Sequence, residues 1–577
     1  MRNSEVADVL YGVADILEMQ NVQFKPNAYR KAARSVEESP KDINEVLRSS
    51  GKEGLKKNFP GVGESIAEKI EEIVTTGKLR YYDELKKKFP KHLFGLMEIR
   101  GLGPKRIKLL YDKLKISNVK QLEAAVRKHR ISKLETFGEK SEEDISKGIE
   151  LFKMGRERML LGYALPTALE IENRLRRLKF VKSVSAAGSL RRRKETIGDV
   201  DILAASSSAD KVMSFFTEMG DVSRVLAKGA TKSSVILKSG LQIDLRVVDS
   251  SSYGAALQYF TGSKEHNIKV RELAMKKGLK INEYGVFKLK GNKKIAGRTE
   301  QEVYKALGMG CPEPEMRENR GEVEAALMHR LPEIISYGSI KGDFHTHTRH
   351  SDGSDSIEEM AAAAKKLGYE YIAITDHSKS MRIARGLSEQ EMLEHVKRIK
   401  AVDRKVGGIK VLAGSEVDIL PNGELDYSDD LLKKFDVVVA SVHSRFKSSR
   451  EEMTKRIVKA LQNPYIDILS HPTGRLIGKR EPYEVDLKEV FEAAAKNRVY
   501  LEINSHPERS DLSDTNAMEA KKHGCKFVIN TDAHSTTGLG YMQLGVSISR
   551  RAWLTSKDVI NASPARQLMK LFKRIKN

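Results

Sequence analysis

The sequence predicts a multidomain protein with a helical N-terminal region, an α+β centre and a C-terminal α/β domain resembling a barrel of about seven strands. Three observations lead to this fold class. The chain has 577 residues, and roughly 150 residues per domain gives about four domains. Amphipathic helical patterns fill residues 1–150, whereas strand patterns begin near residue 155. After residue 335, short apolar strands alternate with amphipathic helices, as in barrels of parallel strands.

The composition favours a protein that binds nucleic acid. A net charge of +23 attracts polyanions, so nucleic acid is the first expected partner and an anionic membrane the second. The chain has no apolar stretch of 18 residues and starts without a secretory pattern. Cys311 and Cys525 are too few for a disulfide framework or a cysteine-based zinc site. We expect a cytoplasmic monomer with no membrane partner, associated with the nucleoid if the source is prokaryotic.

The helical region contains repeated glycine turns. FPGVGESIAEKI (59–70) and IRGLGPKRIKLL (99–110) each place a Gly-x-Gly turn between helices, and TFGEKSEEDISKGI (136–149) is a degenerate third copy. Glycine lets backbone N–H groups at a helix start approach a phosphate, whereas the alternative is a helical hairpin with a glycine cap. Two good copies and the positive charge favour binding to the DNA backbone. The candidate residues are Gly61, Gly63, Gly101, Gly103 and Lys105.

The stretch AAGSLRRRKETIGDVDILAAS (186–206) predicts a nucleotidyltransferase centre. Asp199 and Asp201 are two residues apart on a predicted strand, so both carboxylates leave the same face. A third acid, Asp244, lies on the apolar strand LQIDLRVV. Oxygen ligands of this kind suit two Mg²⁺ ions that activate a primer 3′-hydroxyl and steady the leaving pyrophosphate. Strand ends on a surface often carry Asp-x-Asp, but unpaired acids on so apolar a strand would be costly to bury.

Metal ligands are also expected in the C-terminal region. Its predicted strands are DFHTH, YIAITD, KVLAGSEV, DVVVASV, IDILS, VYLEIN and KFVINTD. Histidines and acids at strand ends would gather at one mouth of a barrel. Imidazole mixed with carboxylate suits two or three Mn²⁺ or Zn²⁺ ions. The nine candidate ligands are His345, His347, Asp352, His377, Glu416, His443, His471, Asp532 and His534. Other histidines, among them His350 and His395, are expected to be solvated or structural.

Residues 1 to about 320 resemble family X DNA polymerases. NAYRKAA (27–33) followed by PGVGESIAEKI is similar to the lyase domain of DNA polymerase beta. The resemblance implies a phosphate-binding role for Lys25 and a Schiff-base role for Lys69 in 5′-deoxyribose phosphate lyase chemistry. Ser65 and Tyr81 stand where the family carries supporting lysines, so Lys69 is alternatively a solvated helix lysine. The implied activity is template-directed filling of short gaps in base excision repair, with gapped or nicked DNA and deoxynucleoside triphosphates as partners.

The same resemblance assigns a nucleotide site. The turn before the Asp-x-Asp pair matches triphosphate contacts, and SYGAALQYFTGSKEHNIKVRELAMKKGLKINEYGVF (252–287) matches the region that selects the nucleotide. Ala164 falls near an arginine of the family, a charge that Arg191, Arg193 or Lys232 could replace. The implied nucleotide-binding residues are Gly188, Ser189, Arg192, Tyr259, Phe260, Thr261, Gly262, Asn267 and Arg271.

Residues from about 335 to 577 resemble the polymerase and histidinol phosphatase (PHP) domain, with every position of its metal-complete ligand set filled. The resemblance implies a metal-dependent phosphoesterase acting as a 3′→5′ exonuclease, a 3′-phosphatase or an AP endonuclease. Metals of the family polarise a phosphate ester and supply a hydroxide. Nearby basic residues that could hold the phosphate are Arg382, Arg385, Arg445 and Lys479.

Six segments follow from these observations: a helix-hairpin-helix lyase-like domain (1–85), a helix-hairpin-helix fingers-like domain (86–152), a nucleotidyltransferase palm (153–250), a thumb-like nucleotide-selecting domain (251–318), a linker (319–337) and the PHP domain (338–577). Two other functions fit parts of the chain. A template-independent nucleotidyltransferase would use the same acids, but Asn267, Arg271 and the hairpins imply a template and duplex. The second alternative is a DNA-gap scaffold with a structural metal domain, which would require neither the three carboxylates nor the nine candidate metal ligands.

Overall fold

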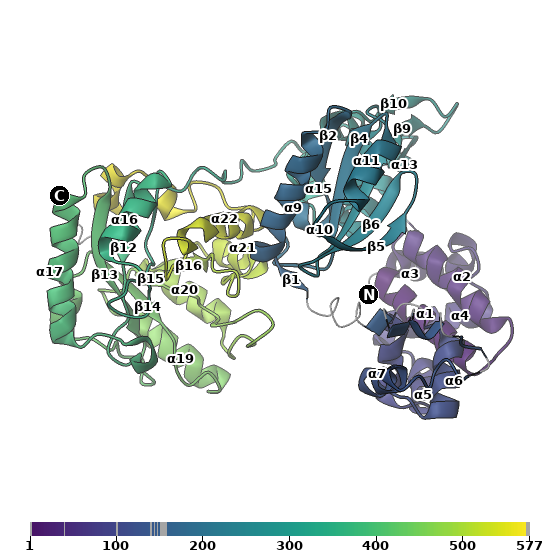
Figure 1. The fold of residues 1–577 in the computed structure, drawn as a ribbon, viewed down its shortest axis with the longest axis horizontal. Coiled ribbons are helices and arrows are strands. Elements are labelled where there is room, and N and C mark those ends of the chain that lie inside the picture. Colours follow the sequence, from purple (N-terminus) through teal and green to yellow (C-terminus); the bar gives the residue numbers. More distant parts are fainter. Residues whose placement is uncertain are drawn as a thin grey trace. The chain divides into compact units, whose positions relative to one another are not determined.

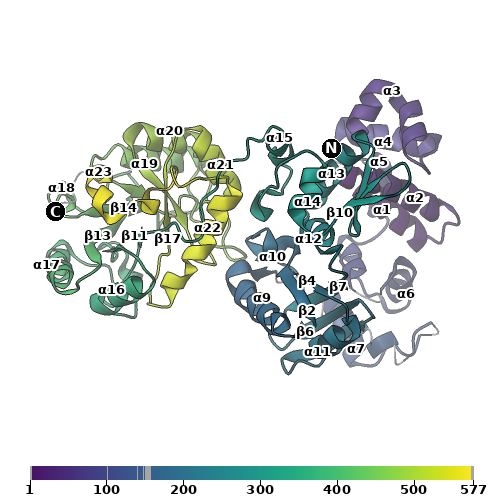
Figure 2. The same ribbon diagram turned by 90° about the horizontal axis from the view of Figure 1, so that it is seen from above.

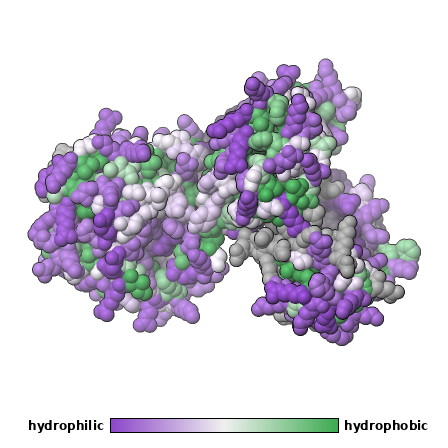
Figure 3. All heavy atoms as spheres, viewed as in Figure 1, coloured by the Kyte–Doolittle hydropathy of each residue, from purple (hydrophilic) through white to green (hydrophobic). Residues whose placement is uncertain are grey.

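The computed structural model describes residues 3–39, 41–99, 102–134, 136–138, 141–143, 145–146, 148–149 and 158–572. It divides into two compact units. Unit 1 comprises Met1–Arg158, Leu237–Gly240 and Lys264–Ala296, and unit 2 comprises Met159–Ile236, Leu241–Ser263 and Gly297–Asn577. Within the described residues, no helix has the length and apolar character needed to cross a membrane. Hydrophilic side chains cover most of the face shown in Figure 3.

Unit 1 begins with a helical region (Figure 1), and its buried side chains form two hydrophobic clusters. Its elements are α1 Asn3–Met19, α2 Lys25–Glu38, α3 Ile43–Asn58, α4 Glu64–Thr76, α5 Arg80–Lys87, η1 Lys91–Glu98, α6 Pro104–Leu114 and α7 Val119–Arg127. Val13, Ala33 and Ile70 pack in the first core, whereas Leu93, Ile107 and Leu122 pack in the second. The predicted helical N-terminal region is confirmed.

The remaining part of unit 1 is a helix followed by a small sheet. Helix α13 (Lys264–Lys276) precedes the antiparallel strands β8 (Leu279–Asn282), β9 (Gly285–Lys288) and β10 (Lys294–Ala296), in the order β10-β9-β8.

Unit 2 starts with a five-stranded sheet in the order β2-β4-β7-β6-β5. The strands are β2 Val181–Ala186, β4 Val200–Ser206, β5 Val222–Lys228, β6 Lys232–Leu237 and β7 Gln242–Val248, with β1 Met159–Leu160 paired separately to β3 Thr196–Ile197. The accompanying helices are α9 Leu161–Arg176, α10 Gly188–Arg191, α11 Ala209–Thr217, α12 Tyr253–Thr261 and α14 Glu300–Ala306. Ala256 and Leu257 of α12 pack with Leu203 of β4, which holds α12 against the sheet.

The C-terminal part of unit 2 is a seven-stranded parallel sheet in the order β11 to β17 (Figure 2). The strands are β11 Gly342–Asp343, β12 Tyr371–Ile374, β13 Lys410–Asp418, β14 Val437–Ser441, β15 Ile468–Leu469, β16 Tyr500–Asn504 and β17 Phe527–Asn530. A parallel bridge between Thr346 and Ala533, just past the first and last strands, brings the sheet close to closure. All seven predicted strands are present, and the predicted barrel-like fold is confirmed.

Helices surround these strands. They are α16 Ile357–Lys366, α17 Glu389–Lys405, α18 Asp429–Leu432, α19 Arg450–Leu461, α20 Leu487–Asn497, α21 Asp514–Lys522, α22 Met542–Arg551 and α23 Leu568–Leu571, with short turns η3 Arg382–Ala384, η4 Gly538–Tyr541, η5 Ile560–Ala562 and η6 Ala565–Gln567. Helices α16, α17 and α19 each begin with a serine and a glutamate that form a capping box. Successive residues of a strand lie on opposite faces of the sheet and pack in two different cores. Ile372 faces the helices, whereas Tyr371 packs with Phe344 and Phe572.

The segment between the two parts of unit 2 is packed rather than loose. The Pro/Glu-rich stretch CPEPEMRENRG (311–321), whose composition suggests a linker, includes η2 (Pro314–Met316). Helix α15 (Glu322–Leu327) lies inside the predicted linker 319–337. Glu315 is buried, where it accepts hydrogen bonds from Tyr337 (2.8 Å) and Arg550 (2.7 Å). Ion pairs that join residues far apart in the sequence therefore hold a segment whose composition suggested a flexible connection.

Candidate functional site

The three predicted carboxylates come together on the five-stranded sheet of unit 2. Strands β4 and β7 are parallel, and Asp201 is the register partner of Asp244. The strand begins at Val200, one residue after Asp199, so Asp199 lies just before the strand rather than on it. Asp199 is exposed, Asp201 is half-buried and Asp244 is buried. The sequence spacing and the strand register thus bring three carboxylates to the same end of two inner strands of the sheet.

The negative charges of these three carboxylates repel one another. Burial, followed by the charges of Asp199 and Asp244, raises the pKa of Asp201 to about 6. Burial also raises the pKa of Asp244, but hydrogen bonds from Gln242 and Lys232 outweigh it and hold that pKa below its ordinary value. The Lys232 ammonium lies 3.1 Å from the Asp244 carboxylate. A cluster of acids that resist simultaneous ionisation fits divalent cations, which prefer hard oxygen ligands.

Gly188 touches this carboxylate cluster through its backbone. Its φ is +58°, and a Cβ at this position would lie 2.4 Å from Oδ2 of Asp201. Both the left-handed backbone and the close approach require glycine. Ser189 follows it in the short helix α10.

The arginines around α10 already have partners. Arg192 donates from Nε to Glu318 (3.0 Å) and from its guanidinium to the Thr261 carbonyl oxygen. Arg191 forms two hydrogen bonds to Glu300 (2.9 and 2.6 Å). Lys232 pairs with Asp244, and Arg193 lies over the Tyr337 ring (5.5 Å to its centroid). The three candidates to replace the missing arginine at Ala164 are therefore engaged in structural contacts.

An ion-pair network joins Arg192 to a helix of the seven-stranded domain. Arg551 of α22 donates to the Arg192 carbonyl oxygen (2.7 Å) and to Glu318 (2.9 Å). It also pairs with Asp514 (2.7 Å), which Arg320 contacts at 3.0 Å. Sequence reasoning missed Glu318 and Arg551 because no local motif marks a contact between residues so far apart.

The other predicted nucleotide-binding residues fall in both units. Tyr259, Phe260 and Thr261 form the last turn of α12, and Gly262 follows as its C-cap with φ +70° in unit 2. The Arg246 guanidinium lies 4.5 Å from the Phe260 ring centroid. Asn267 and Arg271 are one turn apart on α13 in unit 1, where Asn267 is buried.

The two good glycine hairpins have matching geometry. Gly63 precedes α4 with φ −92° and ψ 179°, and Gly103 precedes α6 with φ −96° and ψ 170°. At either glycine an added Cβ would meet no described atom within 4 Å, so both helix starts are open to a ligand. Gly61 has φ +92°. Gly101 and parts of the third copy lie outside the described residues, whereas Lys105 is exposed on α6.

Lys69 contacts both residues that replace family lysines. Its Nζ donates to the carbonyl oxygen (3.1 Å) and hydroxyl (2.9 Å) of Ser65, and lies 5.2 Å from the centroid of the Tyr81 ring. The Lys69 amine is thus engaged by a serine and an aromatic ring, where the family carries supporting lysines. Lys25 is exposed at the start of α2.

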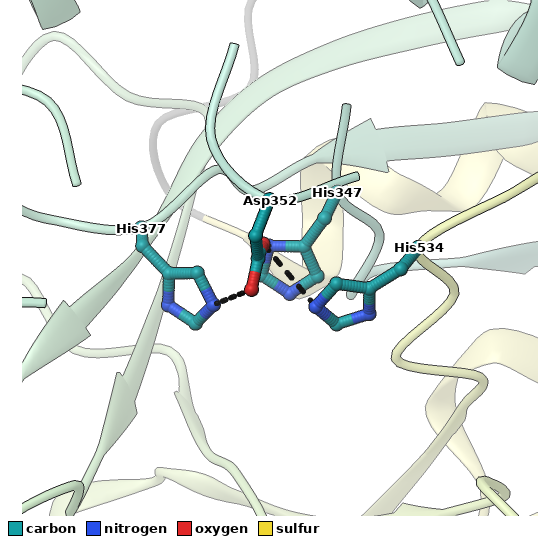
Figure 4. A group of neighbouring side chains, drawn as sticks. All are labelled: His347, Asp352, His377 and His534. Atoms are coloured by element: carbon teal, nitrogen blue, oxygen red, sulfur yellow. Dashed lines mark ion pairs between the residues drawn. The ribbon is translucent and has the colours of Figure 1, made fainter. Parts of the chain in front are cut away.

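The nine predicted ligands of the C-terminal domain form one cluster. All nine lie at the carboxyl ends of strands: His345, His347 and Asp352 after β11, His377 after β12, Glu416 on β13, His443 after β14, His471 after β15, and Asp532 and His534 after β17. Glu416 is central, because Oε2 lies 3.0 Å from Nδ1 of His377 and Oε1 lies 2.9 Å from Nε2 of His471. Figure 4 shows Asp352 between His377 and His534, at 3.6 and 3.3 Å.

Three overlapping groups within the cluster have the spacing of metal sites, with ligand atoms within 4.8 Å of one another. They are His347–Asp352–His377–His534, His345–His347–Asp532 and His377–Glu416–His443. Several buried imidazole nitrogens lack a hydrogen-bond partner among the described residues, including Nε2 of His345 and both nitrogens of His347. Because buried polar atoms are normally satisfied, these nitrogens fit the coordination of two or three metal ions.

The acids of the cluster favour cations. Burial lowers the pKa of His345, but Glu502, Glu416 and Asp532 outweigh burial and raise this pKa. Burial also lowers the pKa of His377, but Glu416 and Asp352 outweigh burial and raise this pKa to about 10. In contrast, burial holds the pKa of His347 at about 4. A negative potential that attracts protons in this way also attracts metal ions, which compete for the same nitrogens.

Comparisons with known proteins agree with this geometry. Residues 1–79 match a helix-hairpin-helix domain, residues 256–318 the DNA polymerase beta thumb and residues 343–506 the PHP domain. A DNA polymerase/3'-5' exonuclease PolX from Bacillus subtilis (strain 168) is 37% identical over 577 residues, which is 100% of both chains. The chain belongs to the PolX family.

Shorter proteins are also similar to this member of the PolX family. A probable phosphatase from Thermoanaerobacter pseudethanolicus is 34% identical over 230 residues, which cover 38% of this chain and 89% of the phosphatase. A probable phosphatase from Acetivibrio thermocellus is 31% identical over 230 residues, which cover 38% of this chain and 90% of the phosphatase.

Around the nine ligands lie supporting residues that sequence reasoning missed. Glu502 contacts Nδ1 of His345 (2.7 Å) and accepts from the backbone N–H of His471 (2.8 Å), and Asp418 lies 2.5 Å from Nδ1 of His443. Arg509 donates to Asp532 (3.0 Å). A signal for Glu502 was present: VYLEIN was the one predicted strand without an assigned ligand, yet it carries an acid among apolar residues.

Two histidines expected to be solvated or structural form a further contact. His395 is buried, with Nε2 2.7 Å from the Asp376 carboxylate, and the His350 ring lies 4.4 Å from the His395 ring. Asp376 also accepts from the backbone N–H of Thr348 (2.8 Å) and thereby holds the loop after β11. This fits a structural role for His395.

Proposed function

We propose that the chain is a DNA-directed DNA polymerase that fills short gaps during base excision repair and processes 3′ ends at a second metal centre. The observation that carries the proposal is the pairing of two complete but different ligand sets in a member of the PolX family. Three carboxylates gather on the five-stranded sheet, and nine histidines and acids gather at the mouth of the barrel. A scaffold would require neither set.

At the polymerase centre, Asp199, Asp201 and Asp244 would hold two Mg²⁺ ions. Bound there, the ions would supply charge stabilisation for in-line attack by the primer 3′-hydroxyl. Gly188, Ser189 and Arg192 bind the triphosphate in this proposal, beside the carboxylate that Gly188 contacts.

Nucleotide selection is assigned to the end of α12 and to α13. The segment Tyr259–Gly262 lies beside the sugar, and Asn267 and Arg271 contact the nascent base pair and the template. The planar guanidinium of Arg271 has the donors that a minor-groove contact requires.

At the barrel centre, the nine ligands would hold two or three Mn²⁺ or Zn²⁺ ions. Bound there, the ions would supply a hydroxide nucleophile near neutral pH and polarise a phosphate ester. Glu502 orients His345 by accepting from Nδ1–H, which leaves Nε2 for a metal, and Asp418 does the same for His443. The principal reaction is 3′→5′ exonuclease cleavage, and 3′-phosphatase and AP endonuclease reactions use the same attack on a phosphate ester.

The helical region provides the contact with gapped or nicked DNA. Backbone N–H groups at Gly61–Gly63 and Gly101–Gly103 approach phosphates, assisted by Lys25 and Lys105. For Lys69, the contacts with Ser65 and Tyr81 favour the solvated-lysine role over Schiff-base formation. The working unit is a monomer acting in the cytoplasm at the nucleoid, with the six segments defined from the sequence as its domains.

One assay on the intact protein tests both activities. Gapped DNA with Mg²⁺ and deoxynucleoside triphosphates is expected to show insertion directed by the template base. With Mn²⁺ and no nucleotides, the 3′-recessed strand is expected to shorten and a 3′-phosphate end to release phosphate. EDTA should stop every reaction. Insertion that ignores the template would favour the template-independent alternative, and no reaction with any divalent metal would favour the scaffold.

A further inference from the structure

A fully exposed isoleucine stands beside the barrel metal centre. Ile383 is 98% exposed in the turn η3, between β12 and α17. Arg382 and Arg385 on either side are also exposed, and neither forms an ion pair with a described residue. An apolar side chain between two arginines that pair with no described acid matches a ligand that offers both an apolar face and anionic groups.

The turn η3 lies within residues 378–387, here called the rim loop. Hydrogen bonds close the base of this loop. Ser378 forms a parallel bridge with Leu387, whose N–H donates to the His377 carbonyl oxygen (3.0 Å). The Gly386 N–H donates to the Met381 carbonyl oxygen (2.9 Å), and a Cβ at Gly386 would lie 1.9 Å from the Ser378 oxygen. The base therefore has one tight conformation that presents Ile383 outward.

The rim loop is also tied to the metal ligands. It follows His377 directly, and the hydroxyl of Ser380 donates to Asp418. The other oxygen of Asp418 contacts Nδ1 of His443 (2.5 Å), while the Ser380 N–H donates to Asp426 (2.7 Å). Two hydrogen bonds thus separate the rim loop from a metal ligand, which fixes the loop at the edge of the site.

We propose that the rim loop binds the paired 3′ end of DNA, with Ile383 packed against the terminal base pair and Arg382 and Arg385 on backbone phosphates. This inference rests on the proposed 3′-end processing. Bases present an apolar face only at an end or at an opened step, and apolar wedges use that face to unstack bases. The phosphates are the complement of the two arginines.

A consequence follows for substrate choice. A metal centre inside the mouth of a barrel accepts one strand more easily than a duplex, so a paired 3′ end must be opened before cleavage. Packing of Ile383 on the last base pair offsets part of the lost stacking. Ile383 therefore matters most for paired ends, less for single-stranded ends, and not at all for a small phosphodiester that fills the metal site alone.

The test uses the full chain and the variant Ile383→Ala, which removes an exposed side chain and leaves the core unchanged. Leu367→Ala is the matched control, because Leu367 is 52% exposed in the same domain but precedes β12, at the opposite end of the strand from the ligands. Three Mn²⁺-dependent substrates are compared: a 3′-recessed duplex, a single strand and bis(p-nitrophenyl) phosphate. A terminal 2-aminopurine in the duplex reports opening of the last base pair in EDTA.

Ile383→Ala is expected to slow digestion of the paired end about tenfold, the size of one well-buried aliphatic contact. Hydrolysis of the small ester should stay unchanged. Opening of the last base pair by the unaltered protein should raise the 2-aminopurine fluorescence, and this rise should be lost in the variant. The double variant Arg382→Ala/Arg385→Ala should weaken binding of both DNA substrates and flatten its salt dependence.

Equal loss on duplex and small ester would overturn the inference, because the rim loop would then support only the metal site. Behaviour identical to Leu367→Ala would also overturn it. If the unaltered protein hydrolyses the ester but digests no DNA, the proposed exonuclease function fails. The 2-aminopurine signal still decides the rim loop, since it requires no cleavage.

Discussion

The two candidate metal centres are built to different degrees of completeness. The polymerase centre has three carboxylates, of which Asp199 is exposed and outside the strand, and Lys232, Gln242 and Ser234 contact Asp244. The barrel centre has nine candidate ligands, of which eight are buried or half-buried and Asp352 is exposed, and Glu502, Asp418 and Arg509 contact ligands of this set. Mg²⁺ commonly takes further oxygens from substrate phosphates, whereas imidazole sites of Mn²⁺ or Zn²⁺ are formed by the protein. In the proposed function, the substrate would complete the first centre, whereas the protein organises the second in advance.

The largest expected effect is at the sparse centre, which depends on three carboxylates. Asp201→Asn should reduce single-nucleotide insertion by about 1000-fold, because several kcal/mol of metal stabilisation is lost. Digestion of 3′ ends should be unchanged, since the barrel has its own ligands. Asp210→Asn, an exposed acid in the first turn of α11, is the control. Loss of both activities would show that one centre serves both reactions.

Removing a ligand from the rich centre should have a smaller effect. Glu416→Gln is expected to reduce 3′-end digestion by about 100-fold and to lower the Mn²⁺ content of the purified protein, because Glu416 contacts imidazoles from several strands. Primer extension should persist. Glu424→Gln changes an exposed glutamate of the same domain and should have no effect. Full digestion activity in Glu416→Gln would mean that the cluster is structural.

Support behind the ligands is the next difference between the centres. Glu502→Gln replaces one of the two acceptor oxygens with an amide N–H₂, so either His345 or the His471 backbone N–H loses its acceptor. We expect the half-saturating Mn²⁺ concentration for digestion to rise by about 10- to 100-fold. Saturating Mn²⁺ should restore most of the rate. A fall in rate that Mn²⁺ does not relieve, together with a lower Tm, would assign Glu502 to folding alone.

Substitution of Arg551, whose ion-pair network reaches Arg192, tests whether the two centres are independent. Arg551→Met removes the donor to the Arg192 carbonyl and leaves Glu318 and Asp514 with one partner fewer. We expect the KM for deoxynucleoside triphosphate to rise about fivefold, since Arg192 keeps Glu318 and Thr261. Because a broken buried pair costs stability, Arg551→Lys and Arg551→Met/Glu318→Gln are measured beside it. A lower Tm with an unchanged KM would limit the network to folding.

The smallest effect is a pH dependence of the sparse centre. Burial and its acidic neighbours raise the pKa of Asp201 to about 6, so protons compete with Mg²⁺ below that pH. The half-saturating Mg²⁺ concentration for insertion should rise about fourfold between pH 7 and pH 5.5, as protonation of one group requires. Asp244, whose pKa lies below its ordinary value, adds nothing in this range. A Mg²⁺ requirement that stays constant over this range would contradict the electrostatic account.

The sequence by itself predicted the helical N-terminal region, all seven barrel strands and the residues that gather in the two candidate ligand sets. It could do so because strand patterns are local and parallel strands direct their carboxyl ends to one edge. Asp201 and Asp244 lie instead near the amino ends of the parallel strands β4 and β7, where they are register partners. The glycine hairpins could also be predicted from the sequence, because a left-handed backbone turn before a helix favours glycine, as at Gly61.

Only the tertiary structure decided which groups support those ligands and which arginines are engaged. Glu502 meets His345, and Arg551 meets Arg192, across long stretches of chain that no local pattern connects. The segment after residue 310 looked like a linker by composition, yet buried ion pairs of Glu315 hold it. Ile383 is an ordinary apolar residue in the sequence, and only the fold exposes it beside the metal ligands. Burial and ion pairing depend on which distant side chains meet, and that is settled when the chain packs.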